Sequence, residues 1–209
     1  MISESNRRPL ASRSTGWAKF LASALVRAGV SPNAISVASL AFAAIGAWLL
    51  IELAHPAVLL AVALCVQARL LCNLLDGMVA IEGGKKSATG GLYNELPDRI
   101  ADSLFIVALG YAAAEPWLGW LGALAAAVTA YIRVLGGTLG LVQDFRGPLA
   151  KQHRMFVLTL GCLIGACELA WLGSRYALLG AAWLIAVGAL VTCVTRTRAI
   201  AGQLRERGV

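Results

Sequence analysis

The sequence predicts an all-α, polytopic membrane protein with six transmembrane helices and an N-terminal interfacial helix. Of its 209 residues, 59% are hydrophobic and only 14% are charged, a composition too apolar for a soluble domain. A stretch of about 20 apolar residues is enough to cross a bilayer as a helix. Six such stretches occur, at roughly 34–54, 57–80, 94–114, 117–142, 154–173 and 176–196.

An amphipathic segment, residues 16–28, precedes the first apolar stretch. Trp17 and Phe20 lie on one face of a helix there, and Lys19 can reach lipid headgroups. The segment is interpreted either as a helix lying at the membrane surface or as a simple entry helix. The predicted organisation is a cytoplasmic segment with the interfacial helix (1–33), a membrane catalytic domain (34–196) and a basic cytoplasmic tail (197–209).

Basic residues gather in alternate connections. They occur in the first thirty residues, in 81–93, in 143–154 and near the C-terminus, whereas the intervening turns contain a single arginine, Arg175. Because cytoplasmic loops carry the excess of Lys and Arg, both termini and the 81–93 loop are predicted to face the cytoplasm from a bacterial-type inner membrane. The net charge of +7 suits anionic headgroups and phosphate-bearing substrates, and no nucleic-acid module is recognised.

Polar side chains stand at the facing ends of the second and third apolar stretches. Asn73 and Asp76 are three residues apart, and Asn94 and Asp98 are four apart, so each pair points along one helix face. The connection 81–93 brings both helices to the same membrane surface. Since carboxylate and amide oxygens are ligands for hard cations, a site for Mg²⁺ or Mn²⁺ is expected between the two helices.

Residues 73–98 fit the spacing D-x2-D-G-x2-A-R-x8-G-x3-D-x3-D without a gap, with Asp76, Gly77, Ala80, Gly90 and Asp98 at required places. The chain therefore resembles the CDP-alcohol phosphatidyltransferase family of membrane enzymes, of the phosphatidylglycerophosphate and phosphatidylinositol-phosphate synthase type. The resemblance implies transfer of a phosphatidyl group from CDP-diacylglycerol to a small alcohol, with release of CMP, in phospholipid biosynthesis.

The resemblance also implies a role for each motif position. The metal ligands would be Asn73, Asp76, Asn94 and Asp98, and Asp98 would also be the general base. Small residues leave room for the nucleotide or pyrophosphate to approach the backbone; these are Gly77, Ala80 and Gly90. Lys85 and Lys86 are candidates for the phosphate contact that the pattern assigns to an arginine, because Ile81 stands in its place.

Asn73 and Asn94 occupy positions where the pattern has aspartate. A neutral amide oxygen can coordinate a cation but contributes no charge, so metal affinity should fall unless another group compensates. Three interpretations follow: an enzyme of altered metal stoichiometry, an enzyme that uses Glu95 or Asp102 as a replacement ligand, and a non-catalytic CDP-lipid-binding or scaffold member. A transporter is less favoured, because transport sites lie near the membrane midplane.

Three basic residues are candidates for the acceptor's phosphate. Arg133 lies inside the fourth stretch, and Lys151 and Arg154 begin the fifth, where a helix start suits a phosphate. The hypothesis is an acidic acceptor such as glycerol 3-phosphate or inositol phosphate, with a neutral amino alcohol or serine left open. Ordinary positive-inside flanking is the alternative explanation for Lys151 and Arg154.

Two further features concern packing. Arg69 and Asp102 lie at similar depths, and an ionised group in the bilayer costs several kcal/mol unless it is paired. They are predicted to form an ion pair, with a direct role for Asp102 at the site as the alternative. Gly161 and Gly165 have the spacing of a close helix contact, which serves either a homodimer or packing within one chain.

Overall fold

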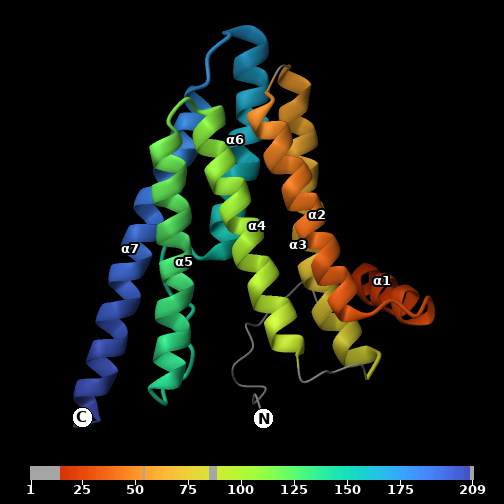
Figure 1. Ribbon diagram of the computed structural model, residues 1–209, viewed down its shortest axis with the longest axis vertical. Coiled ribbons are helices and arrows are strands. Elements are labelled where there is room, and N and C mark those ends of the chain that lie inside the picture. Colours follow the sequence, from red (N-terminus) through yellow and green to blue (C-terminus); the bar gives the residue numbers. More distant parts are fainter. Residues whose placement is uncertain (1–14, 54, 85–88, 208–209) are drawn as a thin grey trace.

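The protein is all-helical in the computed structural model, which describes residues 15–53, 55–84 and 89–207. Six long helices form a bundle, and a short helix, α1, lies crosswise beside one end of it (Figure 1). The elements in chain order are α1 (Gly16–Arg27), α2 (Pro32–Ile51), α3 (Pro56–Glu82), α4 (Gly90–Ala112), α5 (Pro116–Thr138), α6 (Lys151–Trp171) and α7 (Tyr176–Glu206).

Proline residues mark the starts of three bundle helices. Pro32, Pro56 and Pro116 are the first residues of α2, α3 and α5, where a missing backbone N–H costs nothing and the fixed φ suits a helix. Ser31 also caps α2, because its side chain accepts a 3.1 Å hydrogen bond from the backbone nitrogen of Ala34. These signals fix where α2, α3 and α5 begin.

The chain is a multi-pass membrane protein. Among the described helices, α2, α3, α5, α6 and α7 are long and apolar enough to cross a membrane. The six predicted apolar stretches each coincide with one of the helices α2 to α7. The remaining bundle helix, α4, differs in carrying four charged residues, which are Glu95, Asp98, Arg99 and Asp102.

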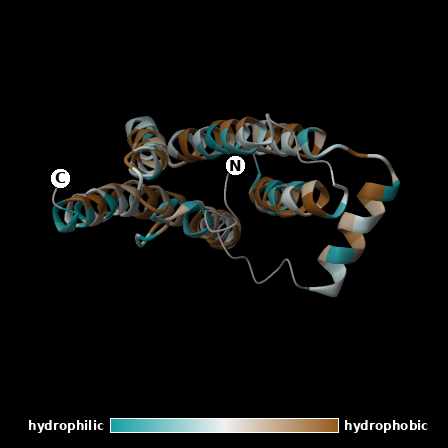
Figure 2. Ribbon diagram, turned by 90° about the horizontal axis from the view of Figure 1, so that it is seen from below, coloured by the Kyte–Doolittle hydropathy of each residue, from teal (hydrophilic) through white to brown (hydrophobic). Residues whose placement is uncertain are grey.

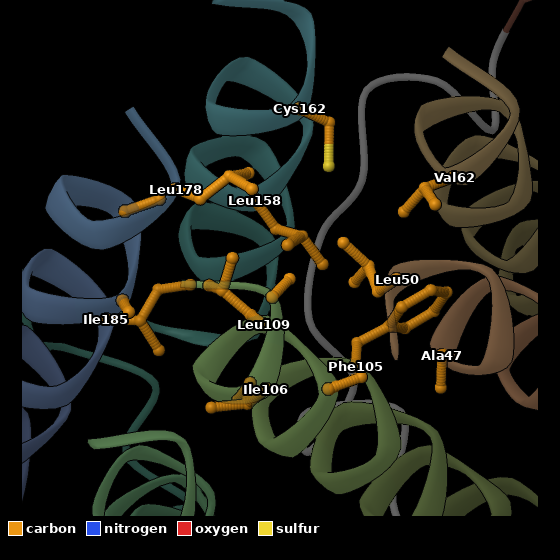
Figure 3. Packing of buried hydrophobic residues seen from close by; sticks show 14 of the residues in the cluster. Ala47, Leu50, Val62, Phe105, Ile106, Leu109, Leu158, Cys162, Leu178 and Ile185 are labelled. Carbon is orange, nitrogen blue, oxygen red and sulfur yellow. The ribbon is translucent and has the colours of Figure 1, made fainter. Parts of the chain in front are cut away.

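The apolar core joins all six bundle helices, α2 to α7, and Figure 3 shows part of it. Leu50, Phe105, Leu109, Leu158 and Ile185 are buried there and point toward one another. Many large hydrophobic residues are exposed on the surface of the bundle, where lipid rather than water is the solvent. Hydrophobic residues recur along the long helices in Figure 2.

Small residues bring two pairs of helices into close contact. A Cβ built on Gly110 of α4 would lie 2.6 Å from the Cα of Gly119 on α5, so these backbones are in direct contact. Gly161 of α6 lies against Ala181 of α7, and Gly165 lies against Leu178. The Gly161 and Gly165 pair therefore packs within the chain.

The connection 139–150 runs back along α7 toward the middle of the bundle. Arg207 donates to the carbonyl oxygen of Gly140 at 3.1 Å, Arg196 donates to that of Arg146 at 2.8 Å, and the amide of Leu149 donates to Thr192 at 3.1 Å. As a result α6 begins beside the middle of α7 rather than at its end (Figure 1). α7 itself continues to Glu206, so the boundary placed at 196 falls inside this helix.

Candidate functional site

Asp98 of α4 contacts side chains from two other helices, α3 and α6, near the start of α6. Its buried carboxylate accepts a 2.7 Å hydrogen bond from the Asn73 amide nitrogen and a 3.2 Å bond from the Nη2 atom of Arg69, both through Oδ1. The Lys151 ammonium group forms an ion pair with Oδ2. Side chains from α3 and α6 thus occupy both oxygens of Asp98.

Asp102 lies one turn further along α4 and is bound by two arginines. Its Oδ1 is 2.8 Å from Nη2 of Arg69, and its Oδ2 is 2.8 Å from Nη2 of Arg154. All three residues are at most 2% exposed. The predicted Arg69–Asp102 pair is confirmed, and Arg154 extends it to α6. Because both carboxylate oxygens are engaged, the contacts favour a packing role for Asp102 over that of a replacement metal ligand.

Asp76 of α3 has one oxygen without a partner. Its Oδ2 accepts a 2.7 Å hydrogen bond from the Ser36 hydroxyl on α2, whereas Oδ1 is buried and makes no hydrogen bond within the described part of the chain. A buried, unpaired carboxylate oxygen is costly, and a divalent cation would satisfy it. The Asn73 nitrogen is used on Asp98, so the amide oxygen is the atom that this residue can offer to a cation.

The motif carboxylates differ in how far protein groups already occupy them. Among residues 15–53, 55–84 and 89–207, no group of three or more His, Cys, Asp or Glu side chains is placed to hold a metal ion. Since protein groups already occupy both oxygens of Asp98, Asp76 is the motif carboxylate that remains open. Oδ1 of Asp76 is therefore the motif carboxylate oxygen that a divalent cation such as Mg²⁺ or Mn²⁺ could bind.

Other motif residues are more scattered than the spacing suggests. Asn94 is exposed near the start of α4, and within the described residues it makes no hydrogen bond to Asp76 or Asp98. Its neighbour Glu95 pairs with Arg133 at 2.7 Å and with Arg99 at 3.6 Å. Gly77 is buried in α3, Ala80 is half-buried, Gly90 begins α4 and Ile81 is 48% exposed. Lys85 and Lys86 lie outside the described residues.

The three candidates for the acceptor's phosphate do not form one group. Arg133 of α5 donates to Glu95 at 2.7 Å and to Gln143 at 2.6 Å, and its guanidinium lies 5.3 Å from the centre of the Phe145 ring. Lys151 contacts Asp98, and Arg154 is bound to Asp102 and to the carbonyl oxygen of Leu149. Arg133 therefore has a different set of partners from the other two.

Two residues that support the site are not identified by the motif. Ser36 orients Asp76, and buried Arg196 of α7 donates to the carbonyl oxygens of Thr129 and Arg146 at 2.7 and 2.8 Å. A buried hydroxyl within an apolar helix is a signal that could single out Ser36. In the sequence, Arg196 looks like any basic residue that flanks a membrane helix on the cytoplasmic side. Only its position beside the returning segment 139–150 distinguishes it from such residues.

No protein-family model matches the chain, but individual relatives align over most of its length. The archaetidylinositol phosphate synthase of Aeropyrum pernix is 32% identical over 188 residues, covering 89% of this chain and 91% of that protein. The phosphatidylinositol phosphate synthase of Mycobacteroides abscessus is 28% identical over 187 residues, covering 86% and 81%.

Solved structures share the fold. The phosphatidylinositol phosphate synthase of Mycobacterium tuberculosis in complex with manganese and citrate superposes with a TM-score of 0.73 at 24% identity, covering 88% of each chain. The same synthase with CDP-DAG bound gives a TM-score of 0.71, covering 88% of this chain and 92% of that one. Given the 32% identity to a synthase aligned over nearly all of both chains, and the matching motif from Asn73 to Asp98, this chain belongs to the CDP-alcohol phosphatidyltransferase family.

Proposed function

We propose that the chain transfers the phosphatidyl group of CDP-diacylglycerol to a hydroxyl of a phosphorylated polyol, such as inositol phosphate or glycerol 3-phosphate, and releases CMP. The observation that carries the proposal is the buried Asp76 carboxylate, which keeps one oxygen unpaired in the family's motif. The names of the archaeal and mycobacterial relatives support an inositol phosphate acceptor over serine.

Asp76 and the amide oxygen of Asn73 would hold Mg²⁺ or Mn²⁺. When bound there, the cation neutralises pyrophosphate charge and polarises the phosphoryl group. The manganese in the mycobacterial structure supports this assignment. Asn94 belongs to the proposed ligand set by its motif position only, and its exposure means that a change in the first turn of α4 would have to bring it closer.

Asp98 is the proposed general base. The acceptor's hydroxyl oxygen attacks the phosphorus that carries the diacylglycerol, while the bond from that phosphorus to the bridging pyrophosphate oxygen breaks and CMP leaves. The hydroxyl proton goes to a carboxylate oxygen of Asp98. Arg69 and Asn73 hold this carboxylate through Oδ1, so Oδ2, which contacts only Lys151 among the described residues, is the oxygen proposed to receive the proton on its second lone pair.

Arg133 is the proposed main contact for the acceptor's phosphate. Its guanidinium is held by Glu95 and Gln143 toward the C-terminal end of α5, and a phosphate dianion can replace the Glu95 carboxylate in the same geometry. Lys151 is partly exposed and adds positive charge, which favours an acidic acceptor. Arg154 stays in the proposed set by its sequence position, because its guanidinium is buried against Asp102. Gly77, Ala80 and Gly90 are proposed to leave space for the nucleotide, with Lys85 and Lys86 near its phosphates.

The proposed topology places α4 as a sixth crossing, α1 at the membrane interface, and both termini and the site on the cytoplasmic side of a bacterial-type inner membrane. The basic residues of the connections support this orientation. A homodimer would use another surface than Gly161 and Gly165, since both pack against α7.

The experiment is a CMP-release assay with purified protein, CDP-diacylglycerol, Mg²⁺ or Mn²⁺, and a panel of inositol phosphate, glycerol 3-phosphate, inositol and serine. The proposal expects release that requires both the cation and a phosphorylated acceptor. Release with serine or inositol alone would contradict the proposed acceptor class. Folded protein that releases no CMP with any acceptor would favour a non-catalytic CDP-lipid-binding or scaffold member of the family.

A further inference from the structure

The Lys151 ammonium group lies beside a carboxylate of the motif, where a metal-binding site would hold a metal ion. Its side chain is only 21% exposed, and its ammonium group meets Oδ2 of Asp98, one of the four motif side chains. We infer that Lys151 is a built-in monovalent cation that takes the place of a second metal ion, so that this chain binds one divalent cation. The inference rests on the proposed function for the meaning of the site, but it concerns cation binding alone.

The charge of the motif supports one divalent cation. Carboxylates at all four positions would carry four negative charges, enough to balance two divalent cations, as in two-metal sites. Asn73 and Asn94 remove two of these charges, which equals the charge of one divalent cation. Asp76 and Asp98 remain, and Asp98 is already paired with Lys151 and Arg69.

The contacts of Asn73 match the same arrangement. Its amide nitrogen donates a 2.7 Å hydrogen bond to Oδ1 of Asp98. An aspartate at position 73 could not donate there, and two carboxylates at this separation would repel each other unless a cation bridged them. Asn73 and Lys151 therefore supply, as a hydrogen bond and an ammonium group, the contacts that Asp98 would otherwise need from a second metal ion.

The fold holds Lys151 at Asp98. The returning segment 139–150 is fixed on α7 by the hydrogen bond from Leu149 to Thr192 and by the close packing of Leu149 on Gly188. Lys151 is the first residue of α6, so its position follows directly from that of the segment. Asp76, whose Oδ1 is buried and unpaired, is left as the open carboxylate for the divalent cation.

The test counts Mn²⁺ bound to the full-length, detergent-purified protein without lipid or acceptor, by electron paramagnetic resonance titration. The inference expects one Mn²⁺ per wild-type chain. Lys151→Met should raise Mn²⁺ affinity by about tenfold or more, because it removes a positive charge next to the site, whereas Lys151→Arg should stay at the wild-type value. Lys19→Met removes the same charge from an exposed position on α1 and should change nothing.

A second variant makes the test independent of how well Lys151→Met folds. Asn73→Asp and Asn94→Asp combined with Lys151→Met restore the four carboxylates and should bind two Mn²⁺ per chain. Two Mn²⁺ per wild-type chain, or unchanged Mn²⁺ number and affinity in folded Lys151→Met, would overturn the inference. CMP release is measured separately, so one Mn²⁺ per chain without turnover would refute the proposed function and leave the inference standing.

Discussion

Ser36 of α2 donates a 2.7 Å hydrogen bond to Oδ2 of Asp76 on α3, and both residues are buried. The bond leaves Oδ1 of Asp76 unpaired within the described residues and fixes the direction in which that oxygen points. Hydrogen bonds to a ligand's other oxygen commonly tune metal affinity. The hydroxyl on α2 is therefore part of the candidate cation site through its bond to Asp76.

Replacing this hydroxyl should weaken cation binding. Ser36→Ala removes the orienting hydrogen bond, and we expect Mn²⁺ affinity to fall by about tenfold, measured by titration of the purified protein. Ser39→Ala is the matched control, because Ser39 is buried on the same helix and its hydroxyl donates to the backbone oxygen of Ser36. If Ser36→Ala and Ser39→Ala bound Mn²⁺ with equal affinity, the Ser36 hydroxyl would have no specific role in the cation site.

Removing the carboxylate between two arginines should destabilise the bundle. Asp102→Ala leaves Arg69 and Arg154 buried without their shared partner, and we expect a loss of about 3–5 kcal/mol in the free energy of unfolding, measured by denaturant titration in detergent. Glu115→Ala, which removes a surface hydrogen bond from Trp117, should cost less than about 1 kcal/mol. Similar losses in both would show that the buried triad contributes little.

Moving the start of α6 should impair turnover. A Cβ at Gly188 would lie 2.7 Å from Cδ1 of Leu149, so Gly188→Ala should displace the segment that places Lys151 and lower the rate of CMP release by about tenfold to a hundredfold. Gly180→Ala lies on the same helix with nothing within 4 Å of the new methyl group and should keep full activity. Full activity in Gly188→Ala would mean that the site tolerates this displacement.

Replacing Arg133 should change the KM of one substrate only. Arg133→Gln removes a charge from the proposed phosphate contact, and we expect the KM for inositol phosphate to rise by about tenfold or more while the KM for CDP-diacylglycerol stays the same. Arg175→Gln is the control, because Arg175 donates to the carbonyl oxygen of Ala112 at the other end of the bundle. A rise in both KM values would point to a general structural effect instead.

Much of this arrangement can be predicted from the sequence because local signals carry it. The apolar stretches and the helix-starting Pro56 and Pro116 locate the membrane helices. Equal depth on consecutive helices predicts the Arg69–Asp102 pair, since a buried charge needs a partner. The motif spacing likewise brings Asn73 and Asp98 into contact.

The contacts of α6 are not predictable in the same way. Lys151 meets Asp98 and Arg154 meets Asp102 across more than fifty residues, and both contacts depend on the path of the segment 139–150. That path is set by its packing on α7, at Thr192 and Gly188, which no local pattern reveals. Basic residues at the start of a helix look the same in a sequence whether they bind the phosphate of a ligand or pair with a buried carboxylate.

The most direct measurement of the central claim compares CMP release by wild type, Asp76→Asn and Asp144→Asn with CDP-diacylglycerol and inositol phosphate, with and without Mn²⁺. Asp144 pairs with the half-exposed Arg146 and serves as the control. We expect wild type and Asp144→Asn to release CMP only when Mn²⁺ is present, and Asp76→Asn to be slower by about a hundredfold or more. Wild-type rates in folded Asp76→Asn, or release that does not require a divalent cation, would contradict the assignment of Asp76 as the open carboxylate of the cation site.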